Sequence, residues 1–204
     1  MRLFAFIIFV SVMLLATCSA PNAVPTQTEA LVLPTNTEPA PAPTEAAPNP
    51  KLPAASFESQ TYINEAAGFA LDYPAGWTVN EVVVGDRGTQ VQFLSSPEIA
   101  EMATLPEGAT RVNATIYLWD PKNDLSTFVA NQKNAWEASG FTIIEEEQLV
   151  LELGLPAVRF TVQTPEANVV FLVTALEDHY LVLSGEGNLD LAKEIVQRVR
   201  PISG

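Results

Sequence analysis

Cys18 is the residue whose chemistry is best defined by its position, because it is the only cysteine in the 204 residues. A lone thiol cannot form an intramolecular disulfide, so it is free for another covalent modification. Cys18 directly follows Leu15, Ala16 and Thr17, which end an apolar N-terminal stretch. We therefore expect the thiol of Cys18 to be the attachment point of a lipid.

The first 17 residues have the layout of a secretory signal peptide. Arg2 supplies a positive charge, and residues 3–16 form an uncharged run of 14 residues. A signal peptide has an apolar run of about 7–15 residues, whereas a membrane-spanning helix needs about 20. Residues 15–18 resemble the bacterial lipobox, although Thr17 is unusual at the position before the cysteine. The alternatives are an ordinary signal peptide with an unmodified cysteine and an uncleaved anchor.

The sequence thus predicts an extracytoplasmic lipoprotein of the cell envelope that is anchored by its lipid to the bacterial cell membrane. Residues 1–17 form the signal peptide, with Leu15, Ala16 and Thr17 as the cleavage motif and Cys18 as the site of lipid attachment. One acyl chain holds a protein on a membrane only marginally, while two or more hold it stably. Bacterial lipoproteins, which this segment resembles, carry a diacylglyceryl group on the cysteine sulfur, and such a group on Cys18, with fatty acids such as palmitate, would meet that requirement.

Residues 18–56 are predicted to be a disordered spacer. Between 19 and 56 the chain has nine prolines and no glycine or aromatic residue. Such a composition cannot bury enough apolar surface to offset the entropy that is lost on ordering. Repeated proline favours the extended polyproline-II conformation, so this Pro-rich linker is expected to be semi-rigid.

Residues 57–204 are predicted to form one globular domain, since 148 residues suffice for a sizeable core. Without the signal peptide the chain carries 9 basic and 24 acidic residues, a formal charge of −15. This charge repels nucleic acid. We expect a monomer whose partners are the membrane, through the lipid, and an unidentified protein or small ligand.

Hydrophobic patterning within this domain alternates between the periods of strands and helices. A helix is expected from a cap at Asn123 or Asp124 to about 139, with Gly140 as its stop. A last helix follows the cap Asn188 and carries one apolar stripe (Leu191, Ile195 and Val199). The run 169–173 is apolar on both faces and predicts a strand that is covered on both sides. Strands are expected at about 69–73, 77–84, 91–93, 112–119, 141–152, 156–164, 168–176 and 179–185.

Two segments near the start of the domain carry a family resemblance. They are Tyr62-Ile63-Asn64 and residues 68–77, which read Gly-Phe-Ala-Leu-Asp-Tyr-Pro-Ala-Gly-Trp. This pattern resembles the opening of PsbP-like domains, a family of extrinsic photosystem subunits and bacterial lipoprotein relatives, and the later order of elements is similar. The resemblance implies an α+β fold, an α/β/α sandwich with a central, mainly antiparallel sheet. It also implies a binding or assembly module without catalysis.

The sequence predicts no catalytic residue, no metal site and no cofactor. His179 is the only histidine, so a zinc site would need an unusual set of carboxylates. Asp120, Asn123 and Asp124 have calcium-binding side chains, but their spacing differs from that of an EF-hand loop. Glu145-Glu146-Glu147 is interpreted as the solvated edge of a strand rather than an acid pair.

Two functions follow from these observations. The favoured one is a non-catalytic binding or assembly module, with Tyr117 and Trp119 as the candidate partner surface; alternatively, a helix covers these two rings. The second is a hydrolase of envelope polymers that uses surface carboxylates such as Asp120 or Glu186. A cleft with two carboxyl groups within about 10 Å of each other, one of them desolvated, would favour the enzyme.

Overall fold

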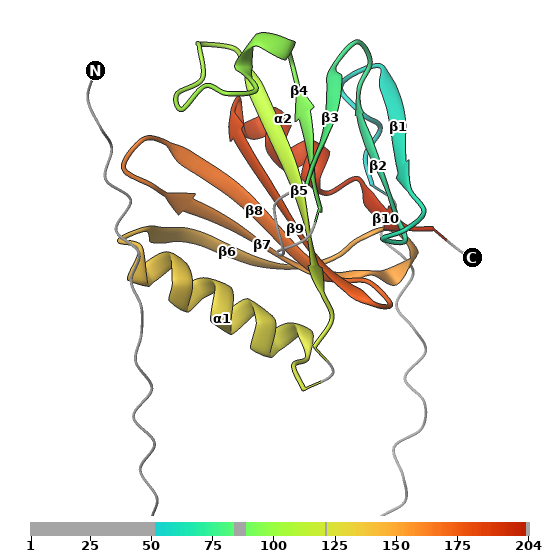
Figure 1. Cartoon of the computed structure of the whole chain (residues 1–204), viewed down its shortest axis with the longest axis vertical. Helices are drawn as coiled ribbons and strands as arrows, with labels where there is room; N and C mark the ends of the chain where they lie inside the picture. The colour runs from blue at the N-terminus through green and yellow to red at the C-terminus, as the bar shows by residue number, and fades with distance from the viewer. Residues whose placement is uncertain (1–51, 84–88, 121, 203–204) are drawn as a thin grey trace, which may run out of the picture. The chain divides into compact units, whose positions relative to one another are not determined.

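The structure, a computed structural model, describes residues 52–83, 89–120 and 122–202, and strands are the most frequent secondary structure in them (Figure 1). These residues belong to one compact unit that spans 46–204. The predicted signal peptide (1–17), Cys18 and most of the predicted spacer lie outside the described residues. Residues 84–88 also lie outside them.

The larger of two sheets has seven strands, and every neighbouring pair is antiparallel. Its strands in spatial order are β3 (Thr78–Val83), β4 (Thr89–Leu94), β5 (Thr110–Leu118), β9 (His179–Gly187), β8 (Asn168–Ala175), β7 (Pro156–Gln163) and β6 (Thr142–Val150). The smaller sheet has three strands, in the order β1 (Ser59–Asn64), β2 (Phe69–Pro74) and β10 (Val199–Pro201), and is also antiparallel.

Both predicted helices are present with their predicted caps. The side chain of Asp124 accepts a hydrogen bond from the Thr127 amide at the start of α1 (Leu125–Ala138). Asn188 accepts one from the Leu191 amide at the start of α2 (Leu189–Val196). Such caps satisfy backbone N–H groups that have no partner in the first turn of a helix.

The prediction that Val199 lies on the last helix is wrong. Helix α2 ends at Val196, and Val199 opens β10, where it pairs with Leu71 of β2. Val199 is fully buried at this position. In the extended conformation, residues 199–201 form backbone hydrogen bonds with the free edge of β2. Hydrophobic periodicity reports only on neighbouring residues, so it cannot predict this pairing with a distant strand. The sequence also did not predict that β1, β2 and β10 form a separate sheet.

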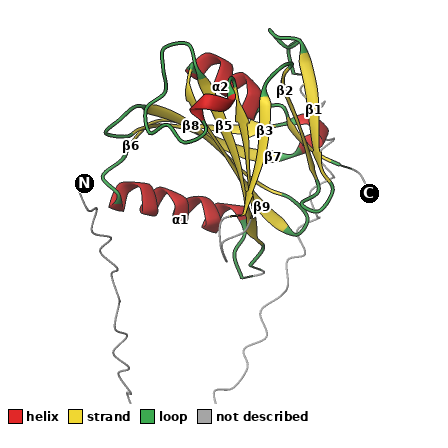
Figure 2. Cartoon of the chain, turned by 45° about the horizontal axis from the view of Figure 1, so that its top comes forward, coloured by secondary structure: helices red, strands yellow, loops and turns green. Residues whose placement is uncertain are grey.

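The two helices lie on opposite faces of the seven-stranded sheet (Figure 2). One core, on the face of α2 and the small sheet, includes Phe69, Leu71, Phe93, Leu183 and Ile195. The other core, on the face of α1, includes Val129, Trp136, Phe160, Val173 and Val182. Strand β8 contributes Val170 and Leu172 to the first core and Val173 to the second. It is therefore covered on both sides, as predicted.

The three consecutive glutamates lie on β6, which is an edge of the large sheet. Their side chains are exposed, and each pairs with a different cation: Glu145 with Lys193, Glu146 with Lys133, and Glu147 with Arg159. Between Ile143 and Glu145 the register shifts by one residue, a bulge. Charged side chains and bulges on an edge strand disfavour pairing with another chain.

Candidate functional site

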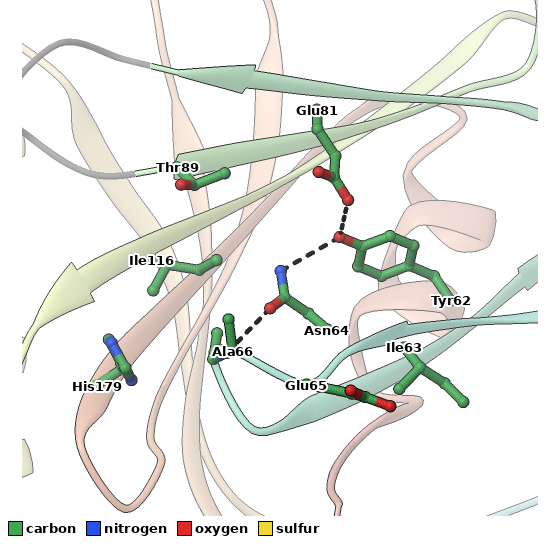
Figure 3. A pocket seen from close by; sticks show the side chains of 10 residues that line it. Tyr62, Ile63, Asn64, Glu65, Ala66, Glu81, Thr89, Ile116 and His179 are labelled. Carbon is green, nitrogen blue, oxygen red and sulfur yellow. Dashed lines mark hydrogen bonds between the residues drawn. The ribbon is translucent and has the colours of Figure 1, made fainter.

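A hollow of about 550 Å³ opens where the β1–β2 hairpin meets the large sheet (Figure 3). Its lining comes from β1 and the following turn (62–67), and from Glu81 on β3, Thr89 on β4, Ile116 on β5 and His179 on β9. A second hollow, of about 500 Å³, shares Glu65, Ala66, Ala67 and His179 with the first. We call the two together the hairpin cleft.

The turn between β1 and β2 is fixed by its own hydrogen bonds. The Oδ1 atom of Asn64 accepts a hydrogen bond from the Ala67 amide at 2.9 Å, and its backbone oxygen accepts one from the Gly68 amide at 2.9 Å. Gly68 has a φ of +73°, a backbone conformation that favours glycine. The turn therefore holds Ala66 and Ala67 between the two hollows.

A chain of hydrogen bonds runs from this turn to the opposite wall of the cleft. The Nδ2 atom of Asn64 donates to the Tyr62 hydroxyl at 3.2 Å, and that hydroxyl donates to Oε1 of Glu81 at 2.6 Å (Figure 3). The Tyr62 ring is held by Phe69 and Phe93, with ring centroids 6.0 and 5.4 Å away. An aromatic ring that is anchored in this way presents its hydroxyl at a fixed place. Tyr62 thus fixes the carboxylate of Glu81.

Partial burial, followed by the hydrogen bond to Glu81, raises the pKa of Tyr62 to about 12. A raised pKa means that the fold favours the protonated hydroxyl. This contribution to stability is fully present below the ordinary tyrosine pKa near 10 and is lost as the pH rises toward 12. At neutral pH, therefore, the Tyr62 hydroxyl is the donor and Glu81 is the acceptor.

The rim of the hairpin cleft is acidic and its floor is apolar. Carboxylates come from Glu65, Glu81, Glu177 and Asp178, and no lysine or arginine is among the described residues that line the two hollows. The floor includes Ala67, Ile116 and Leu176, each of which is at least nine-tenths buried. Beside the cleft, Leu118 is paired across the strands with His179 and is 78% exposed. The cleft therefore combines negative charge with an accessible apolar surface.

Tyr117 and Trp119 are the predicted partner surface. Tyr117 lies on the opposite face of β5 from Ile116, because successive strand residues alternate, and Trp119 directly follows the end of β5. The Tyr117 ring meets Phe128 of α1 edge-to-face at 5.6 Å. Trp119 stacks on Tyr180 at 4.6 Å, and Tyr180 stacks on Phe128 at 4.1 Å. Both predicted residues are half-buried. Helix α1 thus contacts Tyr117, as the alternative interpretation expected, and neither ring reaches the hairpin cleft.

The carboxylates named for the hydrolase alternative make local structural contacts. Asp120 accepts hydrogen bonds from the Lys122 amide and from the Asn123 side chain. Glu186 forms an ion pair with Arg111 at 2.5 Å. Arg111 also donates to three backbone oxygens of residues 99–102, which anchors the long β4–β5 connection.

In residues 52–83, 89–120 and 122–202, no group of three or more His, Cys, Asp or Glu side chains is arranged to hold a metal ion. None of the helices in this part of the chain is long and apolar enough to cross a bilayer.

Sequence reasoning missed Tyr62, Asn64 and Glu81 as members of one site. A weak signal was present, because Tyr62 and Asn64 are two residues apart and so share one face of a strand. Nothing local links them to Glu81, which lies on a different sheet. The sequence suggests His179 only as a metal ligand or base, whereas the structure places it in the wall between the two hollows.

The fold of this chain is similar to that of several solved structures. Cyanobacterial PsbP from Synechocystis sp. PCC 6803 superposes with a TM-score of 0.51 at 16% identity, over 76% of this chain and 99% of that one. A protein of unknown function, PA94 from Pseudomonas aeruginosa, gives 0.44 at 16% identity, over 72% and 99% of the two chains. A protein from Bacteroides thetaiotaomicron VPI-5482 gives 0.36 at 13% identity, over 70% and 48%. No family model and no curated protein matches the sequence.

This chain therefore has a PsbP-like α+β fold, as the opening motif predicted. The mostly antiparallel sheets and the two helices agree with that class.

Proposed function

We propose that this protein is a lipid-anchored, extracytoplasmic binding module without catalytic activity. The lone Cys18 after Leu15, Ala16 and Thr17 supports the anchor, and the proline-rich segment supports a spacer that holds the domain away from the bilayer. The carboxylates considered for hydrolysis hold the chain's own backbone and side chains, which favours binding over catalysis. The placement of the helices on opposite faces of the large sheet supports an α/β/α sandwich.

The binding site in this proposal is the hairpin cleft, and its ligand is a small organic cation or a basic side chain of a partner. The observation that carries the proposal is the carboxylate of Glu81, held by Tyr62 beside the apolar floor at Ile116. Specific sites combine an apolar lining with a few placed polar groups. A cation gains more from a carboxylate beside apolar surface than from one in bulk water.

Calorimetric titration with 1,5-diaminopentane tests this function, with 1,5-pentanediol as an uncharged ligand of similar size. The wild-type chain is expected to bind the diamine and not the diol. Glu81→Gln keeps an acceptor for Tyr62 but removes the charge, so it is expected to weaken binding about fivefold, since an exposed ion pair contributes up to ~1 kcal/mol. A peptide that carries one lysine between two leucines distinguishes a protein partner from a free amine.

Glu147→Gln is the matched control, because Glu147 is paired with Arg159 on β6 and does not line the cleft. Equal binding of the diol and the diamine, or the same loss of affinity in both variants, would contradict the proposed ligand. The surface at Tyr117 and Trp119 stays a proposal for a separate protein contact.

A further inference from the structure

The last residues of the predicted spacer lie against helix α2. Both carboxylate oxygens of Glu194 accept hydrogen bonds from Ser56, one from the amide at 2.7 Å and one from the hydroxyl at 2.5 Å. Arg198 donates to the backbone oxygen of Pro53 at 3.1 Å. We call residues 53–57 the strap.

The two residues that hold the strap also hold each other. Glu194 and Arg198 form an ion pair at 2.8 Å, and their side chains are only 24% and 12% exposed. The Arg198 guanidinium lies 5.6 Å from the centre of the Phe57 ring, within the range of a cation–π contact. Burial alone would raise the pKa of Glu194, but the hydrogen bonds from Ser56 and the charge of Arg198 outweigh it and lower that pKa. These contacts form one connected network rather than isolated surface pairs.

The strap lies between the predicted spacer and strand β1, so its contacts can affect how a pull on the spacer reaches β1. Strand β1 begins two residues after the strap and, in the described part of the chain, pairs only with β2. It also supplies Tyr62, Ile63 and Asn64 to the wall of the hairpin cleft. A pull on the spacer that reached β1 directly would load its first pair with β2, Ser59 with Pro74, before the others. Strand β1 would then separate from β2 pair by pair, toward the residues of β1 that line the cleft.

We propose that the strap is a mechanical stop, in which Glu194 and Arg198 pass the pull of the membrane tether into α2 and keep β1 and the cleft wall in place. Helix α2 suits this role because it packs on β9, β8 and β5 in the middle of the large sheet. This inference rests on the proposed tether, because an untethered domain would bear no such load.

The exchange rate of the Ser56 amide hydrogen in the full chain measures whether the strap stays bound to Glu194. The Ser56 amide is expected to be protected in the wild type. Glu194→Ala removes its acceptor and is expected to accelerate its exchange about tenfold, since a hydrogen bond to a charged group contributes on that order. Glu194→Gln, which keeps the side-chain volume, is expected to be intermediate.

Arg200→Ala is the matched control, because Arg200 is also a partly buried arginine in an ion pair, with Asp72 at 2.9 Å, but has no hydrogen bond with the strap. It is expected to leave Ser56 protected. The Leu183 amide, in the core strand β9, reports in every variant whether the domain is folded. Free exchange of Ser56 in the wild type, or unchanged protection in Glu194→Ala, would overturn the proposal.

Pulling on single molecules tests the mechanical role itself. The thiol of Cys18 takes a handle in the lipid-free chain, and a second handle is placed at the C-terminus. The first rupture is expected at a lower force in Glu194→Ala than in the wild type or Arg200→Ala. Equal forces in all three would overturn the transfer of force into α2. Neither experiment uses lipid or ligand, so failure here is separate from failure of the anchor or the cleft.

Discussion

Cys18→Ser is expected to remove most of the protein from the membrane fraction, or to leave the precursor unprocessed in it. Serine lacks the thiol to which the diacylglyceryl group would be attached. Each buried methylene of an acyl chain contributes about 0.8 kcal/mol to membrane binding. Loss of two chains therefore removes the anchor outright rather than weakening it. Cell fractionation and mass spectrometry of the N-terminal peptide measure both outcomes.

Ser19→Ala is the control, since it changes the next residue and leaves the thiol. It is expected to stay in the membrane fraction with a lipidated N-terminus. If Cys18→Ser is processed normally and retained on the membrane, the anchor is not at Cys18. An unmodified thiol within an uncleaved chain would contradict the signal peptide as well.

Gly187→Ala is expected to lower the free energy of unfolding by about 2–5 kcal/mol, the sum of a backbone cost and a packing cost. Gly187 ends β9 with a φ of +91°, and a Cβ atom there would lie 2.0 Å from the backbone oxygen of Ala109. The left-handed backbone costs alanine roughly 1–2 kcal/mol, and forcing apart well-packed atoms costs about 1–3 kcal/mol. Urea unfolding gives the change from the midpoint at constant slope.

Gly108→Ala separates these two effects. Gly108 has a φ of +78°, but no heavy atom lies within 4 Å of the place that a Cβ atom would take. It is therefore expected to show the backbone cost alone, about 1–2 kcal/mol. Equal destabilisation by the two substitutions would mean that the contact with Ala109 does not limit the packing of β9 against β5.

Local signals were enough to predict most of the elements. Asp124 and Asn188 cap their helices because a short polar side chain can bind the free amides of a first turn. Gly140 follows α1 with a φ of +79°, as expected of a helix stop. Strands β7 and β8 match the predicted strands near 156–164 and 168–176, and both are rich in β-branched and aromatic residues, which favour extended structure. Each of these signals acts within a few residues.

The unpredicted features depend on partners that are distant in the sequence. Val199 is extended because β2, far earlier in the chain, offers it a free edge. Tyr62 and Glu81 meet because two separate sheets come together. The bulge at Ile144 turns Glu145 toward Lys193 on α2, and no turn residue marks it. A single sequence contains no local pattern that predicts such distant pairings. The hairpin cleft, which depends on them, could therefore be identified only in the structure.

The most direct test of the central claim is a titration with 1,5-diaminopentane that is followed by the amide resonances of the chain. We expect the largest shifts at Asn64, Ala67 and His179, which surround the hairpin cleft, and none at Trp136 of α1, in the core on the opposite face of the large sheet. Shifts that are confined to Trp119 and α1, or equal shifts with 1,5-pentanediol, would contradict the account.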